Sequence, residues 1–382
     1  MRHAKYLRTA LLFSALARQT PAQAPPAAPL PAPSISGPLA GAAPIVFNGG
    51  PFGMLDLNGI LSGMGLVQGN PVPGDKTAQA TLSNGQLWLQ KPDGWWQFYV
   101  QAGAYDLPAL ASPFLDASDT VNDFFGPVPV AYVKLAPAKN VSFQFGQLMT
   151  LIGAECTFTF QNMNIERGLL WNQENAINRG AQVNFASGKV TASLSWNDGF
   201  YSNRYTWLTG YLSYAFNSSH TLAFTAGGNY DETAFRTLAT PVQNNSRIYD
   251  VIYTYSKGNW SLEPYFQFTT VPTNPQAGIS SGASTYGGAV LAAYKFKHGF
   301  SLAARGEYIT STGHADAVNL LFGPGSAGWS ATITPTYQNH AFFARAEFSY
   351  VRATTFTPGS AFGSLGLNRS QPRGVAEVGF IF

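Results

Sequence analysis

A group of ionisable residues lies between residues 141 and 185, within one long interval between two predicted strands. It contains five charged side chains, Glu155, Glu166, Arg167, Glu174 and Arg179. Acids and bases close together along a chain can line a narrow passage, where rings of charged side chains select among ions. Charge is scarce elsewhere, because Asp, Glu, Lys and Arg make up 11% of the sequence against about 25% in ordinary soluble domains.

Two segments with the alternation of a β-strand flank this group, at 141–149 and 179–185. In the first, Phe143 and Phe145 lie on one face and Gln144 lies on the other. This period of two predicts a sheet that is apolar on one side and hydrated on the other. The interval between the two strands is too long for a simple connection in a compact β domain, and it indicates a functional loop.

The composition limits how such a chain could enter a membrane. Aromatic residues reach 14% and the mean hydropathy is −0.03, which is typical of neither a helical membrane bundle nor a highly charged soluble protein. Beyond the N-terminus, no apolar run approaches the roughly 20 residues of a membrane helix. A chain of this kind could cross a membrane only as a closed β-barrel, because closure pairs every backbone group of its strands.

The first 24 residues have the pattern of a secretory signal peptide, with Arg2, Lys5 and Arg8 ahead of an apolar stretch. Residues 25–50 follow as a Pro/Ala-rich linker that we expect to be solvated, with nothing to pack. Without residues 1–24, 18 basic residues face 19 acidic ones, so the net charge changes from +3 to −1. Nucleic-acid binding thereby loses its main support.

From residue 51 to residue 382, segments with β alternation are joined in turn by short turns and long loops. Sixteen strands are expected, at 55–67, 86–91, 95–105, 128–136, 141–149, 179–185, 189–197, 207–216, 221–230, 247–256, 260–269, 286–296, 300–310, 329–338, 341–351 and 371–382. Pro264 and Pro335 fall inside strands, so we expect a bulge or a local break at each. An even number of strands with tight turns on one rim is typical of bacterial outer-membrane barrels. The final Phe382 fits the aromatic terminal strand that such barrels present to the barrel-assembly machinery.

The ionisable residues of these strands fall on the face opposite the apolar one. They are Lys134, Asp250, Glu263, Lys295, Arg305, Glu307, Arg345, Glu347, Arg373 and Glu377. A Lys or Arg facing the middle of the lipid would cost roughly 2–4 kcal/mol, so this segregation predicts a lipid-facing exterior. A barrel of this strand number leaves an aqueous channel. We expect Arg305 with Glu307, and Arg345 with Glu347, to form structural ion pairs in its wall.

A series of residues around the charged loop carries a resemblance to a known family. They are Gly146, residues 151–155 (LIGAE), Asn162, Asn164, Arg167 ahead of residues 169–171 (LLW), and Gly180. This region resembles the hallmark region of the OmpL-like β-barrel porin family. The sequence departs from the family pattern at 166–168, which reads Glu-Arg-Gly where Ser-Arg-Ser is expected, and it lacks a Pro/His element at 176–179. The resemblance implies an outer-membrane channel for small solutes with no catalytic residues. We also expect no cofactor and no metal.

The interval 150–178 is the third long loop from the N-terminus. In general diffusion porins, the third loop folds into the lumen and sets the constriction, so its position makes this loop the candidate constriction. Its three acids and single arginine predict a mild cation preference. A loop folded outward over the barrel remains the alternative, as does a non-conducting barrel that serves in adhesion or as a surface structure.

The same expectation names the partners of the protein. They are outer-membrane lipids and lipopolysaccharide, the barrel-assembly machinery and small solutes. A homotrimer is one of the oligomeric states that the sequence leaves open. An outer-membrane hydrolase would need a serine aligned with a strand-borne histidine. Instead, His220, His298 and His340 lie at short turns, and His314 lies in a long loop.

Two further rivals are an adhesin that binds calcium and a soluble exported β protein. Asp106, Asp116, Asp119 and Asp123 could offer oxygen ligands to Ca²⁺, but they lack EF-hand spacing. A soluble propeller would need a blade repeat of about 40–45 residues, and the hairpins here are unequal. Cys156 is the single cysteine, which excludes an intramolecular disulfide and a cysteine-based zinc site.

Overall fold

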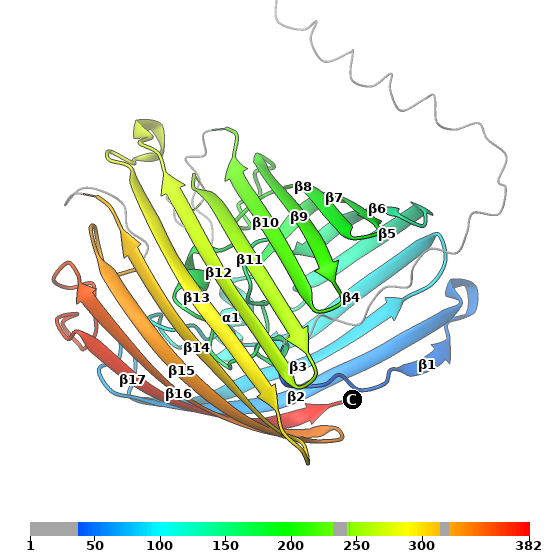
Figure 1. The fold of residues 1–382 in the computed structure, drawn as a ribbon, viewed down its shortest axis with the longest axis horizontal. Helices are drawn as coiled ribbons and strands as arrows, with labels where there is room; N and C mark the ends of the chain where they lie inside the picture. The colour runs from blue at the N-terminus through cyan, green and yellow to red at the C-terminus, as the bar shows by residue number, and fades with distance from the viewer. Residues whose placement is uncertain (1–36, 232–242, 244, 314–320) are drawn as a thin grey trace, which may run out of the picture.

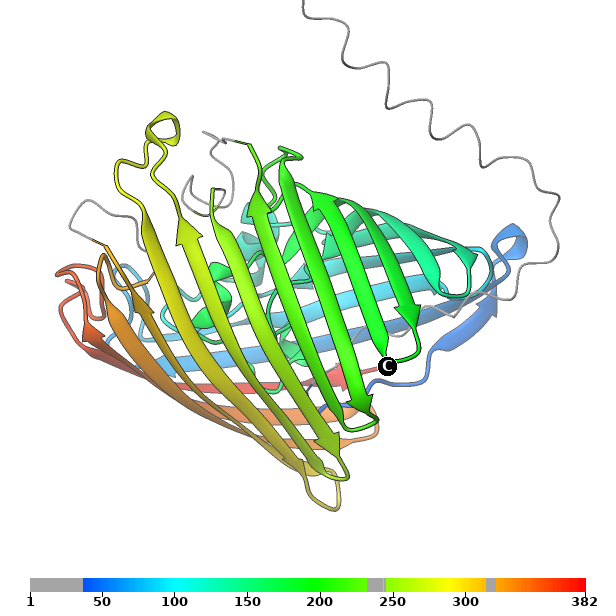
Figure 2. The same ribbon diagram turned by 45° about the horizontal axis from the view of Figure 1, so that its top comes forward.

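The computed structural model of the protein describes residues 37–231, 243, 245–313 and 321–382. The proposed signal peptide and His314 lie outside these residues. Figure 1 shows strands β2 to β17 side by side around a tilted barrel. In Figure 2 the same strands form a continuous wall, with irregular chain segments inside it.

Sixteen antiparallel strands form the closed barrel, because β17 pairs with β2 through residues such as Arg373 with Gln68 and Ile381 with Ile60. The expected number of strands and the first strand are confirmed. The strands are β2 (Met54–Gln68), β3 (Ala78–Lys91), β4 (Trp96–Tyr105), β5 (Val130–Ala138), β6 (Val141–Met149), β7 (Ile177–Ser187), β8 (Val190–Asn197), β9 (Trp207–Asn217), β10 (His220–Asn229), β11 (Arg247–Lys257), β12 (Trp260–Val271), β13 (Ala283–Lys295), β14 (Phe300–Ser311), β15 (Ala327–Asn339), β16 (Phe342–Thr355) and β17 (Ser370–Ile381).

The two rims differ as the sequence predicts. One rim carries the short turns, such as residues 139–140 and 188–189, and the other carries the long loops. Helix α1 (Ala117–Asp123) belongs to the second long loop, and short 3-10 turns occur elsewhere at Gly50–Phe52, Thr159–Gln161, Leu170–Gln173 and Pro275–Ala277. Within the part of the chain that the structure describes, no helix is both long and apolar enough to cross a membrane.

Strand alternation separates apolar from ionisable side chains as expected. In β14, Tyr308 points outward and is 49% exposed, whereas the neighbouring Glu307 points inward and is 6% exposed. Arg305 shares the inner face of this strand and is buried. The ionisable side chains in the middle of this strand therefore face the interior of the barrel, and the buried Ile309 shows that apolar side chains also lie there.

Strand β3 begins earlier than the alternation indicates, at Ala78 rather than at residue 86. A bulge explains the difference. Ser62 of β2 pairs with Asn84 and the next residue of β2 pairs with Leu82, so Ser83 is left over. Since Ser83 and Asn84 are both buried, the period of two is interrupted at this point.

The two prolines interrupt the strand pairing as expected. Pro264 keeps its place opposite β13, but the pairing of β12 with β11 skips the positions around it. Pro335 likewise pairs with Leu302 of β14 while the register with β16 is interrupted. Because proline lacks a backbone N–H, each residue removes ladder hydrogen bonds on one side only, and the barrel remains closed.

The segment before β2 corrects the expectation that residues 25–50 form a solvated linker with nothing to pack. Strand β1 (Ile45–Asn48) pairs with the beginning of β2. Before it, Leu39 is buried among the inward-facing residues Ile60, Phe343 and Ile381. The described half of the predicted linker therefore enters the bore from the rim of short turns.

The interior also differs from the expected open, hydrated channel. Leu110 of the second long loop and Leu169 and Leu170 of the third pack against inward-facing apolar residues of β13 to β16, including Leu291 and Val351. Loops therefore fill one side of the bore with a packed apolar core.

Candidate channel constriction

The third long loop, residues 150–176, lies inside the barrel. Its two ends are held together, since the Thr150 amide donates to the Ala176 carbonyl at 3.0 Å. All residues from 157 to 170 are buried. The loop carries Phe158, Phe160 and Leu169, whose apolar side chains can be buried only against other parts of the interior.

Arg305 of β14 is the first of three wall arginines that hold this loop. Its Nη1 lies 2.7 Å from Glu155 Oε1 and donates to the Glu166 carbonyl at 2.8 Å. The other carboxylate oxygen of Glu155 accepts a hydrogen bond from the Gly168 amide at 2.8 Å. Burial raises the pKa of Glu155, and the charge of Arg305 opposes that rise. The ion pair therefore joins the loop to the wall where no water screens it.

Arg345 of β16 is the second wall arginine, and it binds loop carbonyl groups rather than a loop carboxylate. Its guanidinium donates to the carbonyl groups of Thr159, Asn162 and Met163 at 2.9–3.1 Å. On the same strand, Glu347 accepts hydrogen bonds from two consecutive loop amides, those of Ile165 and Glu166. Arg345 thus binds carbonyl groups of the loop backbone, and Glu347, two residues later, binds its amide groups.

The expected ion pair between Arg345 and Glu347 is wrong. Arg345 instead lies 3.5 Å from Glu377 of β17, the residue directly opposite in the strand register. Side chains directly across two strands are closer than side chains two residues apart on one strand, so the cross-strand partner is preferred. The expected pair of Arg305 with Glu307 does form, at 3.3 Å.

Arg373 of β17 is the third wall arginine and joins two loops. It lies 2.7 Å from Glu166 of the third loop. It also donates to the Ala109 and Ser112 carbonyl groups of the second long loop, residues 106–129. From the sequence, this loop offers only oxygen ligands for calcium, and the structure shows that it also folds inward.

Arg167 connects the second and third loops through its backbone. Its amide donates to the Pro108 carbonyl at 3.0 Å, and its carbonyl accepts from the Leu110 amide at 2.9 Å. Its guanidinium lies over the ring of Trp171 at 4.5 Å. Burial lowers the pKa of Arg167 to about 10, against the opposing charge of Asp106. Arg167 is therefore a buried structural cation between two loops.

The last two charged residues of the expected group lie near the end of the third loop. Glu174 accepts a hydrogen bond from Gln267 of β12 at 2.7 Å, and burial, followed by the charge of Asp250, raises its pKa. Arg179 pairs with Asp198 at 2.7 Å and lies 3.9 Å from the ring of Tyr201. Asp198, which follows β8, was not expected as a partner.

Two wall residues of the expected set lie apart from these clusters. Glu263 is partly exposed and accepts a weak hydrogen bond from Thr254 at 3.3 Å. Lys295 is exposed at the end of β13, next to the short turn 296–299. The structure therefore brings together Glu155, Glu166, Arg167, Glu174, Arg305, Glu307, Arg345 and Glu347, and it leaves Arg179, Glu263 and Lys295 outside.

The opposite wall of the bore is different in character. On β6 to β8, Gln182 donates to Gln144 and Asn184, and Ser193 donates to Asn184 at 2.8 Å. Lys134 of β5 is half-buried beside Gln144. These are mostly uncharged hydrogen-bonding side chains, and most of them keep some exposure to solvent. The loops thus lie against the wall that carries the three arginines, while the side chains on β6 to β8 are less buried.

The aspartates of the second long loop lie in different surroundings. Among the described residues, no group of three His, Cys, Asp or Glu side chains is arranged to hold a metal ion. Asp106 is buried with Thr120 as its partner at 3.1 Å, whereas Asp119 and Asp123 are exposed on α1.

Comparison with solved structures identifies the barrel architecture. An anion-selective porin from Comamonas acidovorans superposes with a TM-score of 0.60 at 11% identity, over 86% of this chain and 99% of that one. OmpT, an outer membrane protein of Vibrio cholerae, gives 0.57 at 13% identity, over 86% and 98%. The outer membrane channel DcaP of Acinetobacter baumannii gives 0.56 at 12% identity, over 86% and 97%. At these identities the likeness establishes the fold alone.

Comparison with curated protein sequences finds no match. A family model, in contrast, matches residues 54–382, which is the entire barrel. Its description is "Putative beta-barrel porin-2, OmpL-like". The expected family is therefore confirmed, and both the family and the porin-like barrel indicate an outer-membrane location. The chain belongs to the OmpL-like beta-barrel porin-2 family.

Proposed function

We propose that this protein is a passive channel for small hydrophilic solutes or ions, narrowed by the loop at 150–178. One observation supports this most strongly. Three buried arginines, Arg305, Arg345 and Arg373, fix the third loop to one wall, while the facing wall keeps polar side chains that are partly exposed. A rigid loop opposite a hydrated wall is an arrangement that sets a constant bore, and selection by size follows from it.

Planar-bilayer recording of the refolded full barrel tests the proposal. We expect discrete current steps, and permeability that decreases with size across a panel of ions, sugars and short peptides. A protein that is folded by its heat-modifiable migration yet passes no current would contradict the proposal. That result would favour the second candidate, a non-conducting surface barrel. The dense packing of Leu169, Leu170 and Phe160 inside the bore is the observation that favours this candidate.

The proposed cation preference is weak, because two of the three loop acids are paired with arginines. Glu155 lies against Arg305 and Glu166 lies against Arg373, both at 2.7 Å. Charges neutralised in this way contribute little to the field in the remaining space. We expect a zero-current potential in a salt gradient that corresponds to a small excess permeability of cations. A strong preference for anions would reject this part of the proposal.

Export and assembly complete the proposal. The short turns would face the periplasm, since the barrel begins with β2 and ends with β17 at that rim, and Phe382 would present the last strand to the barrel-assembly machinery. Exposed aromatic side chains such as Trp196, Trp260 and Tyr308 suit the interface with outer-membrane lipids and lipopolysaccharide. One OmpT structure is described as a trimer form. We extend a homotrimer to this chain as a proposal, which chemical cross-linking in detergent would test.

A further inference from the structure

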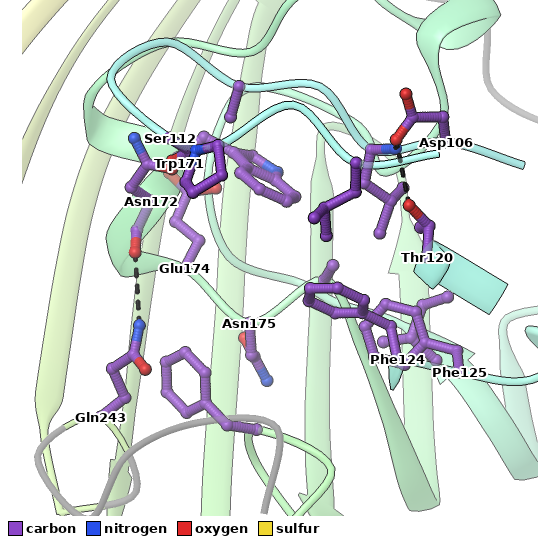
Figure 3. Close-up of a pocket in the computed structure, with 17 residues that line it drawn as sticks. Asp106, Ser112, Thr120, Phe124, Phe125, Trp171, Asn172, Glu174, Asn175 and Gln243 are labelled. Atoms are coloured by element: carbon purple, nitrogen blue, oxygen red, sulfur yellow. Dashed lines mark hydrogen bonds between the residues drawn. The ribbon is translucent and has the colours of Figure 1, made fainter. Parts of the chain in front are cut away.

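The barrel interior contains a cavity of about 390 Å³ between the second and third long loops, which Figure 3 shows. The ionisable side chains among its described lining residues are Asp106 and Glu174, and these are only 1% and 6% exposed. A charged solute would therefore meet mostly apolar and aromatic side chains there, such as Phe124 and Trp171. An accessible charge lies instead on the inner face of β5, where Lys134 is partly exposed.

Lys134 is a base without a partner on one half of the barrel wall. Strands β4 to β10 contain no Asp or Glu, and their two strong bases are Lys134 and Arg179. Arg179 is paired with Asp198 at 2.7 Å. Lys134, in contrast, makes no hydrogen bond or ion pair among the residues that the structure describes. Its ammonium group has lost part of its hydration, and no protein group replaces it.

The neighbours of Lys134 also present donors toward the bore. Gln144 lies directly opposite it on β6, and Gln144 Oε1 already accepts hydrogen bonds from Gln182 and Asn184, both at 3.2 Å. The side-chain nitrogen of Gln144 and the hydroxyl group of Tyr132 make no hydrogen bond within the described part of the chain. Tyr132 precedes Lys134 by two residues on the same face, and all three side chains keep some exposure.

Three neighbouring donors that carry one positive charge suit a carboxylate. The Cβ atoms of residues directly opposite on paired strands lie about 4.5–5.5 Å apart, so the Lys134 ammonium group and the Gln144 amide can reach the two oxygens of one anion. The Tyr132 hydroxyl group can donate to the same anion. The Tyr132 ring stacks on Tyr99 at a centroid distance of 5.6 Å, and its exposed part can contact the apolar body of an organic molecule.

We propose that Lys134, Gln144 and Tyr132 form a binding site for small organic monocarboxylates on the inner face of β5 and β6. The inference rests on the proposed function, since it names a class of solute that would bind on its way through the channel. One lysine balances one carboxylate, whereas an organic cation is repelled. The weak cation preference concerns small ions over the whole bore, and Lys134 reduces it.

Ligand-observed NMR titration of the refolded full-length barrel in detergent measures binding without requiring a current. The probes are benzoate, benzamide and benzylammonium, which share a ring and differ in charge. We expect benzoate to bind most tightly and benzylammonium not to bind. The substitution Lys134→Gln should weaken benzoate binding by about tenfold or more, because a hydrogen bond to a charged group is lost. Lys295→Gln is the matched control, since it removes the same charge at an exposed position at the end of β13.

The substitution Gln144→Glu tests the geometry with little change in shape. Glutamate keeps an oxygen that accepts from Gln182 and Asn184, and it places a carboxylate opposite Lys134. The protein then supplies its own anion to the lysine, so benzoate binding should be lost. In planar bilayers, Lys134→Gln and Gln144→Glu should both raise the permeability of potassium relative to chloride above the wild-type value, and Lys295→Gln should not.

Two results would overturn the proposal: equal affinity for benzoate and benzamide, or unchanged benzoate affinity in Lys134→Gln and Gln144→Glu. If one of these variants fails to give a heat-modifiable barrel, the other decides. Current recordings separate this inference from the channel proposal. A conducting protein that binds no benzoate contradicts the inference alone, whereas benzoate binding without current contradicts the channel alone.

Discussion

Arg305 and Glu155 lie 2.7 Å apart although 150 residues separate them in the chain, and both side chains are buried. One belongs to the barrel wall and the other to the third loop. Each buried charge has lost its hydration, and the opposite charge compensates for this loss only while both partners are present. The placement of the loop therefore depends on a contact that neither the wall nor the loop could make alone.

The substitution Arg305→Gln should release the third loop. Breaking a buried ion pair by removing one partner costs about 3–5 kcal/mol, because the other charge stays buried and uncompensated. We expect a barrel that still folds, with a larger and noisier single-channel current and faster proteolysis between residues 150 and 176. Lys295→Gln is the control, since Lys295 is exposed on the same barrel face. Equal currents in wild type and Arg305→Gln would show that the pair does not hold the loop.

The strands could be predicted from the sequence because period-two alternation and the rule against charge in lipid act on nearly every strand residue. The predicted start of β3 is wrong, because Ser83 forms a bulge that interrupts the alternation. No propensity distinguishes such a residue before its partner strand is known. By contrast, the interruptions at Pro264 and Pro335 could be predicted from the sequence, because proline has no backbone N–H to donate.

The site was harder to predict, because its contacts depend on distance across the bore. The sequence placed Arg305, Arg345 and Arg373 on the inner face, but it could not show that a loop from the other half of the chain lies against them. One signal for this contact is present in the sequence. Leu291 and Val351 are apolar residues on the face assigned to water, and apolar residues there predict that something covers them.

Modification of Cys156 should block part of the current. This residue lies in the third loop and is half-buried, with its backbone held at both ends by the side chain of Asn162. A bulky, water-soluble thiol reagent attached there would occupy space in the remaining bore. We expect a stepwise decrease in single-channel conductance, and no effect of the reagent on Cys156→Ser. Confirmed labelling with unchanged current would count against the proposed constriction.

Leu39 should stabilise the third loop from the rim of short turns. Its segment is fixed by Gln338, which donates to the Ala40 carbonyl and accepts from the Ala40 amide. Replacing Leu39 by Ala removes a buried side chain, which typically costs about 2–5 kcal/mol. We expect larger current fluctuations in Leu39→Ala than in the wild type. Ala40→Ser should leave the current unchanged, because the side chain at this position is exposed.

A second substitution in the same segment tests the contact by adding volume. A Cβ atom at Gly37 would lie 2.1 Å from the Asn162 carbonyl oxygen, so Gly37→Ala must displace either the segment or the loop. Its current should resemble that of Leu39→Ala. Wild-type behaviour in both variants would mean that the segment does not support the loop.

The backbone contact between the second and third loops should weaken as the pH rises. Burial raises the pKa of Asp106 from its ordinary value near 3.8 to about 7, so the folded state holds a proton that the unfolded loop would release. For an acid shifted in this direction, the stabilisation is complete below pH 3.8 and is lost as the pH approaches 7. The reporters are the amides of Leu110 and Arg167, which form the contact between the two loops.

Hydrogen exchange of these two amides, corrected for the intrinsic dependence of exchange on pH, measures the effect. Protection should be greater at pH 5 than at pH 8 in the wild type and should lose most of this dependence in Asp106→Asn, since an amide does not titrate. Asp119→Asn should retain the wild-type dependence, because Asp119 is exposed. If Asp106→Asn kept the full dependence, another group would have to supply the proton. Glu174 would then be the first to replace, because burial and the charge of Asp250 raise its pKa in the same direction.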